Sequence, residues 1–172
     1  LHHQLVFDQP FRILHSDRSF VTTSITIDKH SHLFGGFPFP CTLTLEYRLY
    51  PNNVHIQYTV TSIGDKAVPF GFGLHPHFKR LSGNKKTIIT LPARSVMQTI
   101  ADTLLPNGKL TPVHNVPTPV GDLHLDHVFT NIVKGKHAVV DYTSLGFKIS
   151  LRSSPEFTHI VCWSGHPEAI CI

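Results

Sequence analysis

Residues 68–78 combine the features of a ligand-binding strand with one group that can transfer a proton. If this stretch is a strand, its alternate side chains point to opposite faces. Phe70, Phe72 and Leu74 would then share a buried face, and two glycines and His75 would share the other. Because glycine has no side chain, a ligand could approach the backbone beside His75 closely. The spacing predicts either a ligand floor with a histidine acid or a weakened strand with a structural histidine.

Histidine chemistry of this kind works together with carboxylates, and the chain has only 11 acidic residues. Asp126 is the most distinctive of them, because Leu125 and Val128 place it in an apolar stretch. A carboxylate in such surroundings needs partners. Asp126 could anchor the hydroxyl groups of a polyol, or it could be a salt-bridged or turn-capping aspartate.

Several aromatic side chains could contact a sugar. Sugar rings stack their C–H faces on aromatic rings, and nearby polar groups fix the hydroxyls. The candidates are Phe72, Phe78, Phe129 and Trp163. The alternative for each is packing in the hydrophobic core, which aromatic residues dominate.

Fourteen histidines raise the question of a bound metal. A His-x-His pair places two imidazoles on one face of a strand, and the chain has such pairs at His30/His32 and His75/His77. No cysteine pair, H-E-x-x-H motif or acidic cluster accompanies them. We therefore expect surface or neutral histidines, no metal site and no cofactor.

Length, charge and cysteine usage narrow the class of protein. A chain of 172 residues suits one domain. The net charge of +4 comes from scattered basic residues, which argues against a nucleic-acid binder. No stretch approaches the roughly 18 apolar residues that span a membrane. The odd number of cysteines (Cys41, Cys162 and Cys171) predicts buried free thiols in a reducing compartment, the cytoplasm.

Strand signals are abundant, whereas prolines and glycines interrupt every helical pattern. The predicted strands cover residues 20–27, 42–49, 54–61, 70–74, 87–91, 95–99, 129–133, 138–142, 147–152, 159–163 and 169–172, with hairpin turns at 51–53 and 144–146. Residues 101–122 have little periodicity and are predicted to form a long functional loop. Many short strands separated by turns predict an all-β fold, an antiparallel β-sandwich or barrel.

Three segments resemble motifs of the aldose 1-epimerase (galactose mutarotase) family. Residues 69–78 resemble its G-x-G-x-H-P-Y-F segment, with His77 where tyrosine is more usual. Residues 101–113 resemble its L-P-T-G-x-x-x-P-V loop, with Asn107 in place of threonine. Residues 125–129 resemble its D-x-x-F motif. The order and spacing agree as well, so the resemblance implies the antiparallel galactose mutarotase-like supersandwich.

The resemblance also implies an activity. Members of this family are isomerases that interconvert the α and β anomers of an aldose, here a hexose or a hexose phosphate. A glutamate base takes the proton of the C1 hydroxyl, a histidine acid protonates the ring oxygen, and the ring opens and recloses. His75 matches that histidine, and Asp126 matches a carboxylate that binds sugar hydroxyls. Phe78 and Trp163 are further candidates for contact with the sugar.

Two parts of the family pattern fall at the ends of the chain. The glutamate follows an apolar-Cys-apolar run, and residues 169–172 stop one position before it. Glu168 precedes that run and is not assigned as the base. Residues 2–11 resemble an H-G-F segment that carries a second active-site histidine. His3 is therefore a candidate for substrate binding, although Gln4 replaces the glycine.

We therefore expect residues 1–172 to form a single β-sandwich domain that is incomplete at both ends. Its partner would be a small sugar, with no nucleic acid and no membrane, and its oligomeric state is left open. We expect little or no epimerase activity from these residues alone. One alternative is a carbohydrate-binding β-sandwich module without catalysis, and another is a metal-dependent sandwich built on the His-x-His pairs.

Overall fold

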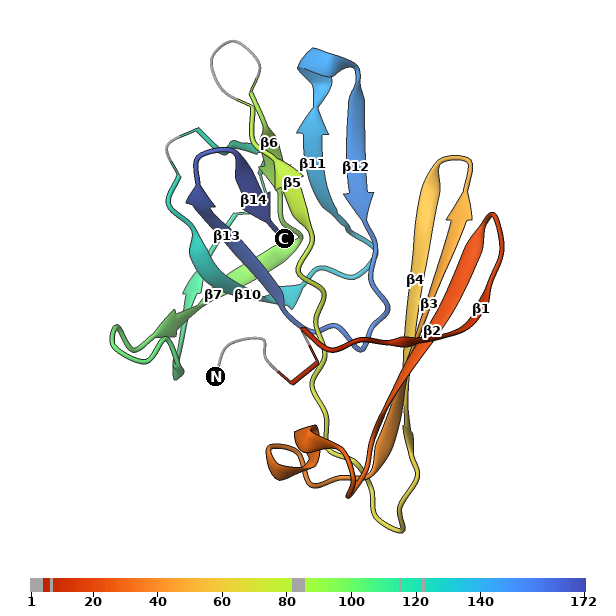
Figure 1. Cartoon of the computed structure of the whole chain (residues 1–172). Helices are drawn as coiled ribbons and strands as arrows, with labels where there is room; N and C mark the ends of the chain where they lie inside the picture. Colours follow the sequence, from red (N-terminus) through yellow and green to blue (C-terminus); the bar gives the residue numbers. More distant parts are fainter. Residues whose placement is uncertain (1–4, 7, 82–85, 115, 122) are drawn as a thin grey trace. The chain divides into compact units, whose positions relative to one another are not determined.

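A computed structural model describes residues 5–6, 8–81, 86–114, 116–121 and 123–172. Strands dominate this part of the chain (Figure 1), and all their pairings are antiparallel. The all-β prediction is therefore confirmed. In the same residues, no helix is long and apolar enough to cross a membrane. The contacts divide the chain into two compact units, residues 1–72 and 73–172, which we describe separately. The single domain stays a prediction.

The first unit is a four-stranded antiparallel sheet. Its strands follow the order of the chain: β1 (Arg12–Ser16), β2 (Phe20–Ile27), β3 (Cys41–Tyr50) and β4 (Asn53–Ser62). The last three were predicted, because their apolar and polar residues alternate with a period of two. A short 3-10 helix, η1 (His32–Gly35), follows β2. Ile27, Leu33 and Cys41 form a small buried core.

The second unit contains two antiparallel sheets. The six-stranded sheet has the order β5 (His77–Lys79), β14 (Ala169–Cys171), β13 (Ile160–His166), β10 (Asp126–Ile132), β7 (Ala93–Thr99) and β8 (Pro106–Pro112). The four-stranded sheet has the order β12 (Phe147–Leu151), β11 (Ala138–Tyr142), β6 (Ile88–Thr90) and β9 (Thr118–Pro119). Between β11 and β12, η2 (Thr143–Leu145) ends at Gly146, whose φ of +83° suits glycine. That turn is where the sequence predicted it.

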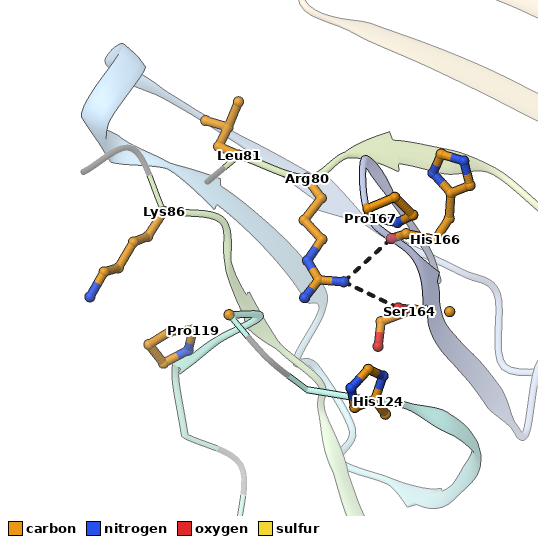
Figure 2. Close-up of a pocket in the computed structure, with 10 residues that line it drawn as sticks. Arg80, Leu81, Lys86, Pro119, His124, Ser164, His166 and Pro167 are labelled. Carbon is orange, nitrogen blue, oxygen red and sulfur yellow. Dashed lines mark hydrogen bonds between the residues drawn. The ribbon is translucent and has the colours of Figure 1, made fainter. Parts of the chain in front are cut away.

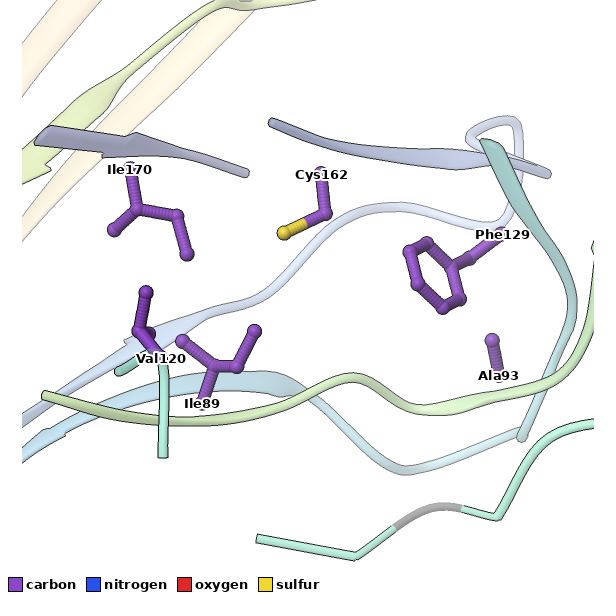
Figure 3. Packing of buried hydrophobic residues seen from close by; sticks show 6 residues of the cluster. All are labelled: Ile89, Ala93, Val120, Phe129, Cys162 and Ile170. Atoms are coloured by element: carbon purple, nitrogen blue, oxygen red, sulfur yellow. The ribbon is translucent and has the colours of Figure 1, made fainter. Parts of the chain in front are cut away.

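The hydrophobic core of the second unit lies between these two sheets (Figure 3). Ile89 enters it from the four-stranded sheet, and Phe129, Cys162 and Ile170 enter it from the six-stranded sheet. Cys162 and Ile170 are fully buried. Side chains alternate between the two faces of a strand. The residues next to Cys162 in β13 and next to Ile170 in β14 therefore point away from this core.

Two predictions about the chain trace are wrong. Residues 70–74 form no strand, and Phe70 and Leu74 are 55% and 41% exposed. Prolines precede and follow this stretch, and a residue without an N–H cannot donate to a ladder. The long loop predicted for residues 101–122 contains β8 and β9. Its prolines fit β8, which is an edge strand and can do without some donors. Asp122, at the end of that range, lies outside the described residues.

Candidate active site

Four neighbouring strands of the six-stranded sheet place Asp126, Trp163, Cys171 and His77 side by side. The register pairs Asp126 with Trp163, Trp163 with Cys171, and Cys171 with His77. Residues that are paired directly in an antiparallel ladder point to the same face. We call these four residues the cross-strand row. With strands about 4.8 Å apart, the row extends over about 14 Å of the sheet.

The cross-strand row lies on the face opposite the core. Cys162 precedes Trp163 and Ile170 precedes Cys171, and both preceding residues belong to the core cluster. Alternation therefore turns Trp163 and Cys171 away from that core. Cys171 is nevertheless only 2% exposed. A buried residue on this face means that other side chains cover it, and His75 is one of them.

His75 contacts the row through Cys171 and His77. Its Nδ1 is 3.0 Å from the Cys171 Sγ, and its ring centroid is 4.9 Å from that of His77. Burial raises the pKa of the Cys171 thiol to about 11, so the thiol keeps its proton at neutral pH. The contact with Cys171 thus fixes the position of the His75 ring.

Trp163 is the aromatic member of the row and the one tryptophan of the chain. Its ring centroid is 6.2 Å from that of His77. The indole also lies over Gly165, because a Cβ added there would be 2.7–2.9 Å from three ring atoms. The missing side chain of Gly165 therefore leaves the space that the indole occupies.

Asp126 is exposed at the other end of the row. Its backbone N–H donates to the His127 Nδ1 at 3.1 Å. Among the described residues, none forms an ion pair or a hydrogen bond with the Asp126 carboxylate. The salt-bridged alternative therefore finds no support there, and both carboxylate oxygens can accept from a ligand's hydroxyl groups.

The other predicted site residues lie elsewhere. Phe78 follows His77 in β5, so its side chain points to the opposite face and packs against the core cluster. We therefore leave Phe78 out of the site. Phe129 is itself a core residue. In the first unit, Phe72 packs on Tyr58 with ring centroids 3.8 Å apart. His3 lies outside the described residues. The structure therefore brings together three of the five residues that we proposed for the site.

The sequence suggested His77 as a neighbour of His75 through the His-x-His spacing, but sequence reasoning missed Cys171. Cys171 was predicted only to be a buried free thiol, which is correct. It reaches His75 because β14 pairs with β5, a contact between residues 96 positions apart. The usable signal was the alternation in residues 169–172, which turns the cysteine to the face opposite Ile170.

A cavity of about 470 Å³ surrounds Arg80 in the second unit, and Gly165 is among the residues that line it (Figure 2). The guanidinium donates from Nη1 to the backbone carbonyls of Ser164 at 3.2 Å and His166 at 3.3 Å. Lys86 and His124 also line this cavity, but none of the predicted site residues does. Because Arg80 ties the end of β5 to the backbone of β13, we place the candidate site at the row instead.

The chain resembles known proteins in both sequence and structure. The sequence model of the family described as aldose 1-epimerase matches residues 2–171. Among curated proteins, none matches the chain. A galactose mutarotase-like protein from Lactobacillus casei is 23% identical with a TM-score of 0.78, and the match covers 96% of this chain and 60% of that one.

Two further solved structures agree. A galactose mutarotase-like protein from Clostridium acetobutylicum is 15% identical with a TM-score of 0.83, covering 98% of this chain and 56% of that one. A galactose mutarotase related enzyme from Lactobacillus acidophilus is 18% identical with a TM-score of 0.67, covering 97% and 59%. The predicted galactose mutarotase-like fold is confirmed, and the chain spans 56–60% of the length of these three structures.

Proposed function

Because this chain belongs to the aldose 1-epimerase family, we propose that the cross-strand row and His75 bind a sugar and take part in interconverting its α and β anomers. The observation that carries this proposal is the pairing of Asp126 with Trp163 beside the contact of His75 with Cys171. An aromatic face, an uncommitted carboxylate and an oriented imidazole supply the sugar-binding groups and the acid of an anomer-interconverting site, which needs a base in addition.

Each group has a separate task in the proposed reaction. Trp163 stacks on the C–H face of the sugar, and Asp126 accepts hydrogen bonds from its hydroxyls. His75 gives a proton to the ring oxygen while a base removes the proton of the C1 hydroxyl. The C1–O bond of the ring then breaks, and the free aldehyde turns and recloses. Cys171 is a positioning residue, because it acts through His75.

The base is expected directly after Ile172. If β14 continued by one residue past Ile172, the side chain of that residue would point to the same face as those of Ala169 and Cys171. Its side chain would therefore lie on the face of the cross-strand row. A glutamate there would stand close to His75 and Cys171, and the acid and the base would flank one bound sugar.

The chemistry of the sugar can be tested at β5. Lys79 shares the face of His77 by alternation, whereas Arg80 binds backbone carbonyls around its own cavity. If the substrate carries a phosphate, Lys79 is its partner. A hexose 6-phosphate should then bind more tightly than the hexose, and Lys79→Met should remove only that difference. The three free cysteines support a reducing compartment such as the cytoplasm for this reaction.

Two measurements test the proposal. Trp163 fluorescence during titration with a hexose reports binding, and polarimetry of a fresh anomer reports interconversion. We expect residues 1–172 to bind sugar but to interconvert anomers at close to the buffer rate. Adding one glutamate after Ile172 should raise that rate, whereas adding one glutamine should not.

In the extended chain, His75→Ala should lower the rate by about 10²–10⁴-fold, the usual contribution of general acid catalysis. A second candidate function is carbohydrate binding without turnover, which the Asp126–Trp163 pair also favours. Saturable binding together with a buffer-level rate in the glutamate-extended chain would refute catalysis and leave that binding function. No fluorescence response to any hexose or hexose phosphate would refute both.

A further inference from the structure

Three metal-ligating side chains meet at one end of the cross-strand row. His75, His77 and Cys171 each offer one ligand atom, and these atoms all lie within 4.8 Å of one another. The His75 Nδ1 and the Cys171 Sγ are 3.0 Å apart. A tetrahedral zinc ion, with Zn–S near 2.3 Å and Zn–N near 2.0–2.1 Å, holds its ligand atoms about 3.5 Å apart. The 3.0 Å separation and the 4.8 Å upper limit on the others lie close to that value, so small side-chain rotations can close the group around an ion.

We propose that His75, His77 and Cys171 form a binding site for one soft divalent cation of the zinc class. Imidazole and thiolate are the ligands that zinc prefers, whereas carboxylate sites suit magnesium or calcium. Three protein ligands leave a fourth position open for water or another small ligand. The site thus resembles metal sites with an exchangeable ligand, rather than structural sites in which the protein supplies all four ligands.

The fold holds two of the three ligands in place. His77 and Cys171 are opposite each other in the β5–β14 pairing, so the ladder sets their separation. Both histidines are exposed and Cys171 is buried beneath them. An ion can therefore enter from solvent through the imidazoles and meet the thiol at the bottom of the site.

The binding step involves no change of oxidation state. Each imidazole donates a nitrogen lone pair to the cation. A sulfur–metal bond forms as the S–H bond of Cys171 breaks, and the proton leaves to solvent, since a coordinated thiol is deprotonated outright. The contact between Cys171 and His75 is replaced by the bonds of both residues to the ion.

The other His-x-His pair supplies a matched comparison. Among the described residues, the group of His75, His77 and Cys171 is the one that brings three such ligands together, and His30 and His32 have no third partner of this kind. Both sites therefore contain a His-x-His pair, and Cys171 is the additional ligand that distinguishes the proposed site.

Cobalt(II) provides the direct probe, because a cobalt–thiolate bond gives a charge-transfer absorption band in the near ultraviolet. Metal-free protein should bind one cobalt(II) ion with this band, and zinc should displace it. Cobalt should also quench the fluorescence of Trp163, whose ring centroid is 6.2 Å from that of His77. Cys171→Ala should abolish the band, and His77→Ala should weaken binding by tenfold or more.

The controls are His30→Ala, which alters the other histidine pair, and Cys162→Ala, which removes a buried thiol on the opposite face of the same sheet. Both should keep the band and the affinity of the wild type. Absence of the band in the wild type would overturn the proposal, and so would its persistence in Cys171→Ala. If Cys171→Ala does not fold, His77→Ala decides the matter, because a solvent-exposed histidine can be replaced without unfolding the chain. Unchanged affinity in that variant would also overturn the site.

One consequence rests on the proposed function. An ion on His75 removes the proton donor, so zinc should suppress anomer interconversion in the glutamate-extended chain. Since the cobalt band reports binding without any turnover, a failure of catalysis and a failure of metal binding are separate results.

Discussion

Replacing Gly165 with alanine should displace the aromatic ring that we propose to hold the sugar. The added Cβ would stand 2.7 Å from Cζ2, 2.8 Å from Cε2 and 2.9 Å from Nε1 of Trp163. The ring must move by at least about 0.7 Å to regain ordinary contact distances. Overpacking of this kind costs roughly 1–3 kcal/mol of folding free energy.

The displacement also affects ligand binding, since Trp163 has to meet the sugar face at a defined place. We expect Gly165→Ala to shift the emission maximum of Trp163, to lower the free energy of unfolding in urea by about 1–3 kcal/mol, and to weaken sugar binding by about tenfold. The two effects are separable, because the affinity is measured on the fraction that remains folded in buffer.

Gly35→Ala is the matched control for this change. A Cβ at Gly35 would have no heavy atom within 4 Å, and its φ lies outside the positive range. That variant should be neutral or stabilised by about 0.4–1 kcal/mol, through the lower entropy of the unfolded chain. If Gly165→Ala matches the wild type in emission and stability, then the indole does not lie over Gly165 and our account of the site is wrong.

Three further predictions test the site and the core. Asp126→Asn keeps the side-chain volume but removes the charge. Hexose affinity in a Trp163 fluorescence titration should therefore fall by about tenfold, while the midpoint of urea unfolding stays unchanged. An altered midpoint would mean that Asp126 has a structural role. Tyr142→Phe removes the hydroxyl that donates to the Lys79 carbonyl at 2.6 Å, and should lower the free energy of unfolding by about 1–2 kcal/mol; an unchanged value would show that this bond adds nothing. Burial raises the pKa of the Cys162 thiol to about 12, from 9.0 when unperturbed. Above pH 9 the unfolded state then binds fewer protons than the folded state, so stability should fall by about 1.4 kcal/mol per pH unit for this thiol up to its folded pKa. Urea unfolding at several pH values should show a shallower fall in Cys162→Ala, and equal slopes would contradict this origin.

The fold could be predicted where the pattern is local. β2 and the hairpin of β3 and β4 follow from alternation over eight to ten residues and from a turn rich in asparagine. β1 was missed because all its residues are exposed, so it carries no alternation of burial to detect. β5 was missed for a different reason. It has three residues, and its strand character comes from pairing with β14, far away in the sequence.

Members of the candidate site could be proposed from the sequence, but their arrangement could not. His75 was proposed from the glycine-rich spacing beside it and from the family motif, Asp126 from its apolar neighbours, and Trp163 from its aromatic ring. That Asp126 stands opposite Trp163 depends on the register of β10 against β13. Register is set by packing of the whole sheet, and a slip of one residue would turn every side chain to the other face. No local pattern contains that information.

His75 connects the two proposals, and its surroundings explain why both can hold. With the neutral thiol beside its Nδ1, the imidazole is held at the cross-strand row, where we propose that it acts as the acid toward a sugar. With a cation present, the same thiol loses its proton and the imidazole becomes a ligand. Cys171 cannot donate to His75 and coordinate a metal at once, so the two states exclude each other. The ladder that fixes Cys171 opposite His77 is common to both, which makes the protonation of a single sulfur the difference between an acid site and a metal site.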